Sequence, residues 1–197
     1  MKTFVAGKTI VVHRRPWTDV GEIAALTAAW DWNTALTIDD DGAALALIRG
    51  GMTWRAAAYD DTETWRAVGG SPEGPQWDVG VEDPTIWRDA RNDSIYHALA
   101  HVFRPFYGAH AWAHAPPGRD WSKPLDWRVT GVAYDNVVNF TDGTSHAFAR
   151  RERPHLVFGE DGVTPVTLST SAQPTGTPGA PGVDATYTLL QPVKTRR

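Results

Sequence analysis

A strand–turn–strand pattern that occurs three times is the sequence feature that most constrains the fold of this chain. The copies span Asn33–Arg49, Asp83–His101 and Arg153–Ser169. Each has a polar residue, Pro or Thr, two apolar positions, a turn rich in Asp, Asn or Gly, and a second apolar run. The first and third copies carry Asp41-Gly42 and Asp161-Gly162 at their turns, and Asp-Gly is a strong hairpin signal.

The segments between the copies supply further predicted strands: Thr53–Tyr59, Thr64–Val68, Ala109–His114, Trp127–Ala133 and Thr186–Val193. A unit of about four short antiparallel strands that recurs in this way is typical of a β-propeller blade. A β-sandwich also has many short strands and turns, but the repeat favours the propeller. We therefore predict an all-β chain, a single domain over residues 1–197 with about three to four blades.

Alternation along two predicted strands indicates which side chains share a face. In GAHAWAH the strand period of two puts three alanines on one face and His110, Trp112 and His114 on the other. An all-alanine face lets neighbouring sheets approach closely. Read as one strand, Ser145–Arg153 places Arg150 and Glu152 on the same face.

Three other segments have weaker signals. Thr9–His13 is a short β-branched run and is expected to be a strand. Thr18–Trp30 has helical spacing and a capping-box pattern, which predict a short helix. Residues 169–185 are rich in Thr, Pro, Gly and Ala, and we expect a mobile surface loop there.

Composition excludes several classes of function. The chain has 197 residues, a formal net charge of −4 and no cysteine. We therefore expect no nucleic-acid partner, and structural disulfides, zinc–thiolate sites and thiol nucleophiles are excluded. We expect no membrane span, because no apolar run approaches about 18 residues. The N-terminus lacks a signal-peptide pattern, and the compartment is left open.

In a propeller the innermost strands of all blades begin near one end of the central channel, so the residues at the head of each repeat are expected to converge. Here these residues are Asn33, Asp83 and Glu152. A proline after Asp83 is expected to hold that residue extended. Two carboxylates from different blades that face one cavity are the arrangement that glycoside hydrolysis needs, one protonated and the other ionised.

Several motifs in the same order resemble proteins related to glycoside hydrolase family 43, which are five-bladed β-propellers allied to the family 32 invertases. The motifs are VEDPTIWRD, GAHAWAH, FTDGTSHAFARRERPHLVF and TYTLLQPV, and the resemblance runs from Asn33 to the C-terminus. It implies a carbohydrate substrate and no cofactor. It also implies that Glu152 is the general acid, and that Asp83 modulates the acidity of this group and binds the sugar.

The chain departs from the family pattern at its N-terminus. Only 32 residues precede Asn33, and the two early aspartates, Asp19 and Asp31, lack an Asp-Pro context for the third family carboxylate. We therefore expect that the N-terminal blade or blades are missing. The chain is then a truncated enzyme, a non-catalytic relative or one part of a split protein. An unclosed propeller also exposes a strand edge, which favours self-association.

The remaining candidates for substrate contact are Asn33, Glu82, Trp87, His110, Trp112 and Arg150. Each also has a plainer interpretation. The two acids of the Glu82-Asp83 pair can bind nearby arginines, Glu152 can belong to a solvated charge cluster, and tryptophans usually pack in cores. We expect no metal site, because His97 and His101 on a strand lie about 13 Å apart. Hydrolysis of glycosidic bonds is the leading hypothesis, and carbohydrate binding without turnover is the alternative.

Overall fold

The computed structural model describes residues 4–5, 8–9, 33–69, 80–89, 91–92, 95–102, 107–174 and 186–194. The predicted helix at Thr18–Trp30 and most of the predicted strand at Thr9–His13 lie outside these residues. Within them the chain is all-β, and its sheets are antiparallel and open. None of the described helices has the length and apolar character that a membrane span requires.

The first two of the three larger sheets are four-stranded meanders, and each begins with one of the first two copies of the repeat. The first sheet consists of β3 (Thr34–Ile38), β4 (Ala44–Ile48), β5 (Thr53–Ala56) and β6 (Arg66–Gly69). The second sheet consists of β7 (Val81–Arg88), β8 (Ile95–Val102), β9 (Tyr107–His114) and β10 (Arg128–Tyr134). Short 3-10 turns, η1 (Arg49–Gly51) and η2 (Pro117–Arg119), lie in their connections.

The third copy of the repeat forms most of the first two strands of the third sheet. This sheet has three strands, β13 (Arg150–Phe158), β14 (Pro165–Gln173) and β15 (Tyr187–Pro192). Two small hairpins complete the described part: β1 (Phe4–Val5) with β2 (Lys8–Thr9), and β11 (Val137–Asn139) with β12 (Ser145–Ala147). The turns at Gly42 and Gly162 both have positive φ, as the two Asp-Gly signals predict.

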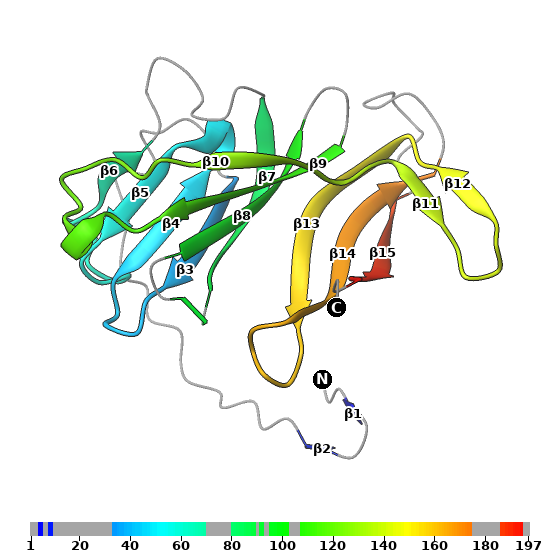
Figure 1. The fold of residues 1–197 in the computed structure, drawn as a ribbon, viewed down its shortest axis with the longest axis horizontal. Coiled ribbons are helices and arrows are strands. Elements are labelled where there is room, and N and C mark those ends of the chain that lie inside the picture. The colour runs from blue at the N-terminus through cyan, green and yellow to red at the C-terminus, as the bar shows by residue number, and fades with distance from the viewer. Residues whose placement is uncertain are drawn as a thin grey trace.

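The three larger sheets lie side by side in chain order (Figure 1), and their first strands are neighbours. Strand β7 contacts β3 on one side and β13 on the other. The hydroxyl of Thr85 on β7 also donates a hydrogen bond to the carbonyl of Pro154 on β13. The heads of the three repeats therefore meet, as the repeat predicts.

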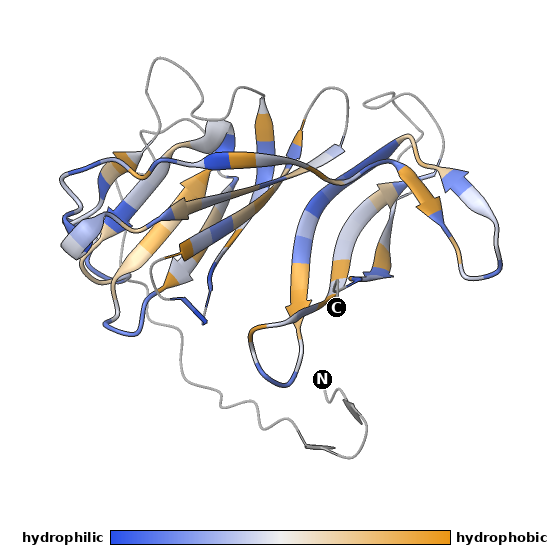
Figure 2. Cartoon of the chain, viewed as in Figure 1, coloured by the Kyte–Doolittle hydropathy of each residue, from blue (hydrophilic) through white to orange (hydrophobic). Residues whose placement is uncertain are grey.

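The core has one part on each face of the second sheet. Its alanine face packs against the first sheet, where Ala109, Ala111 and Ala113 are fully buried beside Leu45 and Leu47. The opposite face carries Leu99 and Tyr134, which pack against Leu168 of the third sheet. Figure 2 shows that β13 is hydrophilic at its start and hydrophobic at its end, and Leu156 in the second half of this strand packs against the same part of the core.

Two expectations for the C-terminal part need correction. Ser145–Arg153 is not one strand, because β12 ends at Ala147 and β13 begins at Arg150. The break follows the burial of Phe148, whose N–H bonds to the carbonyl of Asn136. The predicted loop at residues 169–185 also begins too early, since β14 continues to Gln173, and residues 175–185 lie outside the described part.

Candidate functional site

A row of four residues across the second sheet forms the base of the candidate site. Glu82 on β7 pairs with His101 on β8, His101 with Gly108 on β9, and Gly108 with Tyr134 on β10. Residues directly opposite each other in a ladder share one face of the sheet. All four therefore lie on the face that packs against the third sheet.

Asp83 stands beside this row at a β-bulge. The register shifts between Glu82 and Thr85, and Asp83 has φ of 50°. The expectation that the following proline holds Asp83 extended is therefore wrong. Asn33 stabilises the left-handed backbone, because its amide oxygen accepts from the N–H of Asp83 at 2.5 Å and its Nδ2 donates to Oδ1 of Asp83, also at 2.5 Å.

Glu152 lies near His101 and comes from the third sheet, where β13 has a second β-bulge. The register of β13 shifts between Glu152 and His155, and Arg153 has φ of 52°. Arg153, directly before a proline like Asp83, has its Nε 3.9 Å from Oδ1 of Asp83. Two copies of one bulged motif thus present Glu82 and Asp83 on one side and Glu152 on the other.

Glu82, Asp83 and Glu152 are named here the carboxylate cluster, and the ring of His101 lies between two of its members. Nδ1 of His101 is 3.2 Å from Oε1 of Glu82 and 4.0 Å from Oε1 of Glu152. The His101 side chain is fully buried, whereas 12 to 15% of each cluster side chain is exposed. The carboxylates are thus partly accessible to solvent, and Glu82 and Glu152 lie next to a buried imidazole.

Each member of the cluster contacts an arginine. Nε of Arg150 donates to Oε1 of Glu152 at 2.5 Å, and Arg150 and Glu152 share a face as expected. Arg49 lies 3.6 Å from Glu82, with half of its side chain exposed. Together with Arg153 these guanidinium groups balance the formal charge of the three carboxylates.

The donor set could also hold a divalent cation. One ligand atom each from Glu82, His101 and Glu152 lie within 4.8 Å of one another. Carboxylate oxygens and an imidazole nitrogen suit zinc or manganese. A cation would have to compete with Arg49 for Glu82 and with Arg150 for Glu152. These ion pairs therefore disfavour cation binding. The expectation of no metal stays a prediction.

Tyr134 is the last residue of the row, opposite Gly108 on β9. Its side chain is 7% exposed, and its ring lies beneath the guanidinium of Arg151, 4.8 Å from the ring centroid. Burial raises the pKa of the Tyr134 phenol, the Arg151 charge opposes this rise, and the charges of Asp83 and Glu152 add to it. The hydroxyl therefore keeps its proton at neutral pH.

Three other predicted contacts lie away from the cluster. Trp87 pairs with His97 four rows along the ladder, about 13 Å from Glu82, and the two rings stack with centroids 5.2 Å apart. His110 lies 3.1 Å from His97 and 2.8 Å from the hydroxyl of Thr130. Trp112 lies in the Trp87 row, with Arg128 over its ring. Trp87 and the two histidines form an aromatic and histidine group that contacts Phe158 of the third sheet through Trp87.

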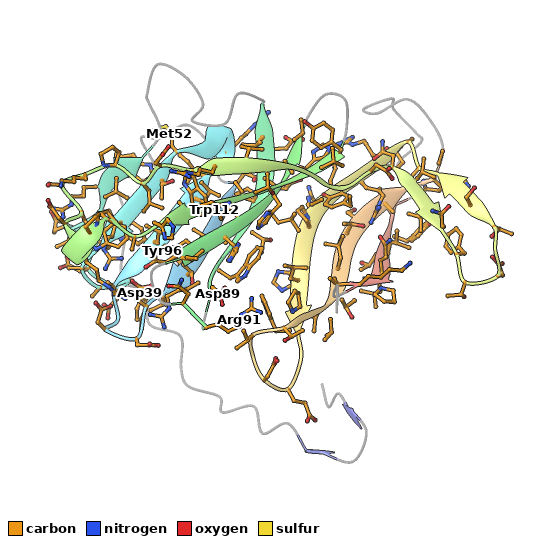
Figure 3. All side chains as sticks on the ribbon, in the orientation of Figure 1. Asp39, Met52, Asp89, Arg91, Tyr96 and Trp112 are labelled. Atoms are coloured by element: carbon orange, nitrogen blue, oxygen red, sulfur yellow. The ribbon has the colours of Figure 1, made fainter. Side chains whose placement is uncertain are left out.

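A second polar network lies at the far end of the first two sheets. Asp39 accepts from the Tyr96 hydroxyl at 2.8 Å and from Arg55 at 3.2 Å, and Figure 3 shows Asp39 and Tyr96 close together. A pocket of about 380 Å³ beside this network includes Arg55, Arg66 and Trp121 in its lining. Asp39 follows the end of β3, whereas Asn33 precedes its start, so the network is separate from the carboxylate cluster.

Sequence reasoning brought Asn33, Glu82, Asp83, Arg150 and Glu152 to the site but missed two residues. The sequence pattern suggests His101 only as a metal partner for His97 and does not point to Tyr134. The strand register would have revealed both, because Glu82, His101, Gly108 and Tyr134 occupy one row. That register depends on bulges, which leave no clear trace in the hydrophobic pattern.

No protein-family model matches the chain, and no curated protein matches it significantly. The assignment of a function therefore depends on the motifs and on the geometry of the carboxylate cluster.

Proposed function

We propose that this chain is part of a β-propeller of the five-bladed glycosidase type and that its carboxylate cluster hydrolyses glycosidic bonds. The three larger sheets correspond to blades whose first strands, β3, β7 and β13, surround a common axis. The observation that supports the function is that carboxylates from two sheets gather at the heads of β7 and β13. Glu82 and Glu152 both lie within 4.0 Å of His101, and Arg153, next to Glu152, lies 3.9 Å from Asp83.

In this proposal Glu152 protonates the leaving oxygen, and Asp83 binds the sugar and tunes the acid. Asn33 fixes the orientation of Asp83 through its two hydrogen bonds. Glu82 and His101, both on the second sheet, lie next to Glu152 and help to hold it in position. Arg150 must turn away from Glu152 for the acid to hold a proton, because the hydrogen bond in the structure is one between a guanidinium and a carboxylate.

The first prediction concerns Glu152. Purified wild-type chain should release nitrophenol from at least one of a panel of 4-nitrophenyl arabinosides, xylosides and fructosides. Glu152→Gln should lower kcat/KM by about 100-fold or more, because general acid catalysis contributes roughly 10²–10⁴-fold. Glu160→Gln is the matched control, since Glu160 is exposed in the β13–β14 turn. Equal rates for wild type and Glu152→Gln would remove Glu152 from the mechanism.

One observation favours a second candidate function, carbohydrate binding without turnover. Every carboxylate of the cluster has an arginine within 4 Å, namely Arg49, Arg150 or Arg153. Such paired carboxylates can accept hydrogen bonds from sugar hydroxyls while none of them donates a proton. Calorimetry with arabino- and xylo-oligosaccharides distinguishes the two candidates, because binding without release of nitrophenol from any glycoside supports the second.

A further inference from the structure

The hydroxyl of Tyr134 is a buried polar group whose burial no contact explains. Within the described part of the chain the hydroxyl oxygen has no hydrogen-bond partner, although its surface is fully covered. A buried hydroxyl without a partner is destabilising, so its retention in a native structure calls for a reason. Phenylalanine would fill the same space without this cost.

The strand geometry directs Tyr134 toward the cluster. Ala133 forms a bulge between Val132 and Tyr134, which sets Tyr134 opposite Gly108. A Cβ on Gly108 would lie 1.9 Å from Cε1 of Tyr134, so the ring occupies the space of the missing side chain. The next residue along this row is His101, and beyond it lies Glu82.

The charges around Tyr134 fit a hydrogen-bond donor. Burial raises the pKa of its phenol, and the charges of Asp83 and Glu152 add a smaller rise. The protonated hydroxyl therefore complements a cluster whose own oxygens can only accept while they are ionised. The ion pairs of Arg49 and Arg153 with the cluster are partly exposed and long, at 3.6 and 3.9 Å, and such pairs are weak. The hydroxyl is fully covered in the structure, so a sugar must displace these arginines before it can reach the hydroxyl.

We infer that Tyr134 is a substrate-binding residue whose hydroxyl donates a hydrogen bond to an oxygen of the sugar held by Asp83 and Glu152. This inference rests on the proposed function, whether the site hydrolyses the sugar or only binds it. It assigns the donor to the second sheet and the carboxylate acceptors to both the second and third sheets. A sugar that lacks the matching oxygen should be discriminated against.

Tyr96 provides a matched control for a purely structural tyrosine. Both tyrosines are buried and belong to the second sheet, but the hydroxyl of Tyr96 bonds to both oxygens of Asp39 at 2.8 and 2.9 Å. Tyr96→Phe breaks these bonds at the far end of the sheets and should lower the thermal stability without changing the site. Tyr134→Phe breaks no protein bond of the described residues and should leave the stability unchanged or raise it.

The experiment measures kcat/KM on the best aryl glycoside and the melting temperature for wild type, Tyr134→Phe and Tyr96→Phe. We expect Tyr134→Phe to lower kcat/KM about five- to tenfold, the range of one neutral hydrogen bond, with a melting temperature that is unchanged or higher. We expect Tyr96→Phe to show the reverse pattern. A site role is supported only by this opposite behaviour of the two variants.

Three outcomes separate this inference from the proposed function. If wild type is active and Tyr134→Phe matches it in kcat/KM, the inference is wrong and the function stands. If wild type binds an arabino- or xylo-oligosaccharide without hydrolysis and Tyr134→Phe weakens binding about fivefold or more, the inference stands and hydrolysis is wrong. If wild type neither hydrolyses nor binds any of these sugars, both proposals are overturned.

Discussion

The absence of a side chain at position 108 decides where the Tyr134 ring lies. A methyl group there would overlap Cδ1, Cε1 and Cζ of that ring at 1.9 to 2.4 Å. We predict that Gly108→Ala displaces the ring and lowers the free energy of unfolding by about 1–3 kcal/mol, the usual cost of overpacking. Urea unfolding followed by tryptophan fluorescence measures this loss.

Gly80→Ala is the control for Gly108→Ala, because a Cβ at Gly80 meets no atom within 4 Å. Removal of the obstructing ring should also relieve the strain. The double variant Gly108→Ala/Tyr134→Ala should therefore be less destabilised than the sum of its single variants. Simple additivity would show that the two residues are not in steric contact.

At the residue scale the sequence predicted which side chains lie close together better than it predicted their backbone conformation. The head positions Asn33, Asp83 and Glu152 do meet, but a local rule for the residue before proline assigned Asp83 an extended backbone. The two hydrogen bonds between Asp83 and Asn33, 50 positions away, outweigh that local preference. Such a contact is set by tertiary structure and cannot be derived from the neighbours of Asp83 alone.

At the scale of elements, one buried side chain joins the strands of the third sheet. Arg151 on β13 is 1% exposed and donates to the carbonyl of Asp135 at 2.7 Å and to Oε1 of Gln191 on β15 at 3.0 Å. We predict that Arg151→Met lowers the free energy of unfolding by about 1–3 kcal/mol, because partly buried acceptors lose their donor. Chemical denaturation measures the change.

The effect of Arg151→Met should be local to the third sheet. Amide hydrogen exchange should become faster in β13–β15 and remain slow in β8 and β9. Arg128→Met serves as the control, because Arg128 is exposed on β10 and lies over Trp112. Equal acceleration in the second and third sheets would show that Arg151 stabilises the whole fold and not one sheet.

Elements with local signals were predictable, and the break within Ser145–Arg153 was not. The Asp-Gly turns and the alternation of GAHAWAH depend on neighbouring residues, and the structure confirms both. The alternation in Ser145–Arg153 continues through Phe148 without interruption. Phe148 leaves the ladder because it enters a core beside Val138 and Ala172, which only the folded chain brings together.

At the scale of the whole molecule, the junction of the second and third sheets combines the candidate site with two half-buried histidines. His97 and His110 lie between these sheets, next to Trp87, and Phe158 of β13 contacts the same tryptophan. The pKa of His110 is lowered to about 4 by burial and by the charge of His97, and burial lowers the pKa of His97. Both rings are therefore neutral in the folded protein at neutral pH.

This arrangement makes the stability depend on pH in a defined direction. The histidines of the unfolded chain bind protons below about pH 6.5, whereas His110 in the folded protein does so only near pH 4. The unfolded state therefore binds more protons within this window, and stability must fall as the pH decreases from about 6.5 toward 4. We predict a loss on the order of 1–2 kcal/mol between pH 7.5 and 5, once solvent screening of these partly exposed rings is considered.

Urea unfolding at the two pH values tests this prediction, with His110→Asn beside wild type. The variant should be less stable at pH 7.5, because it loses the contact with His97, but its stability should change less between the two pH values. His155→Asn, an exposed histidine on β13, should keep the wild-type dependence. If His110→Asn retains the full dependence, the acid sensitivity comes from groups outside this junction, and the two sheets are not coupled through the histidine pair.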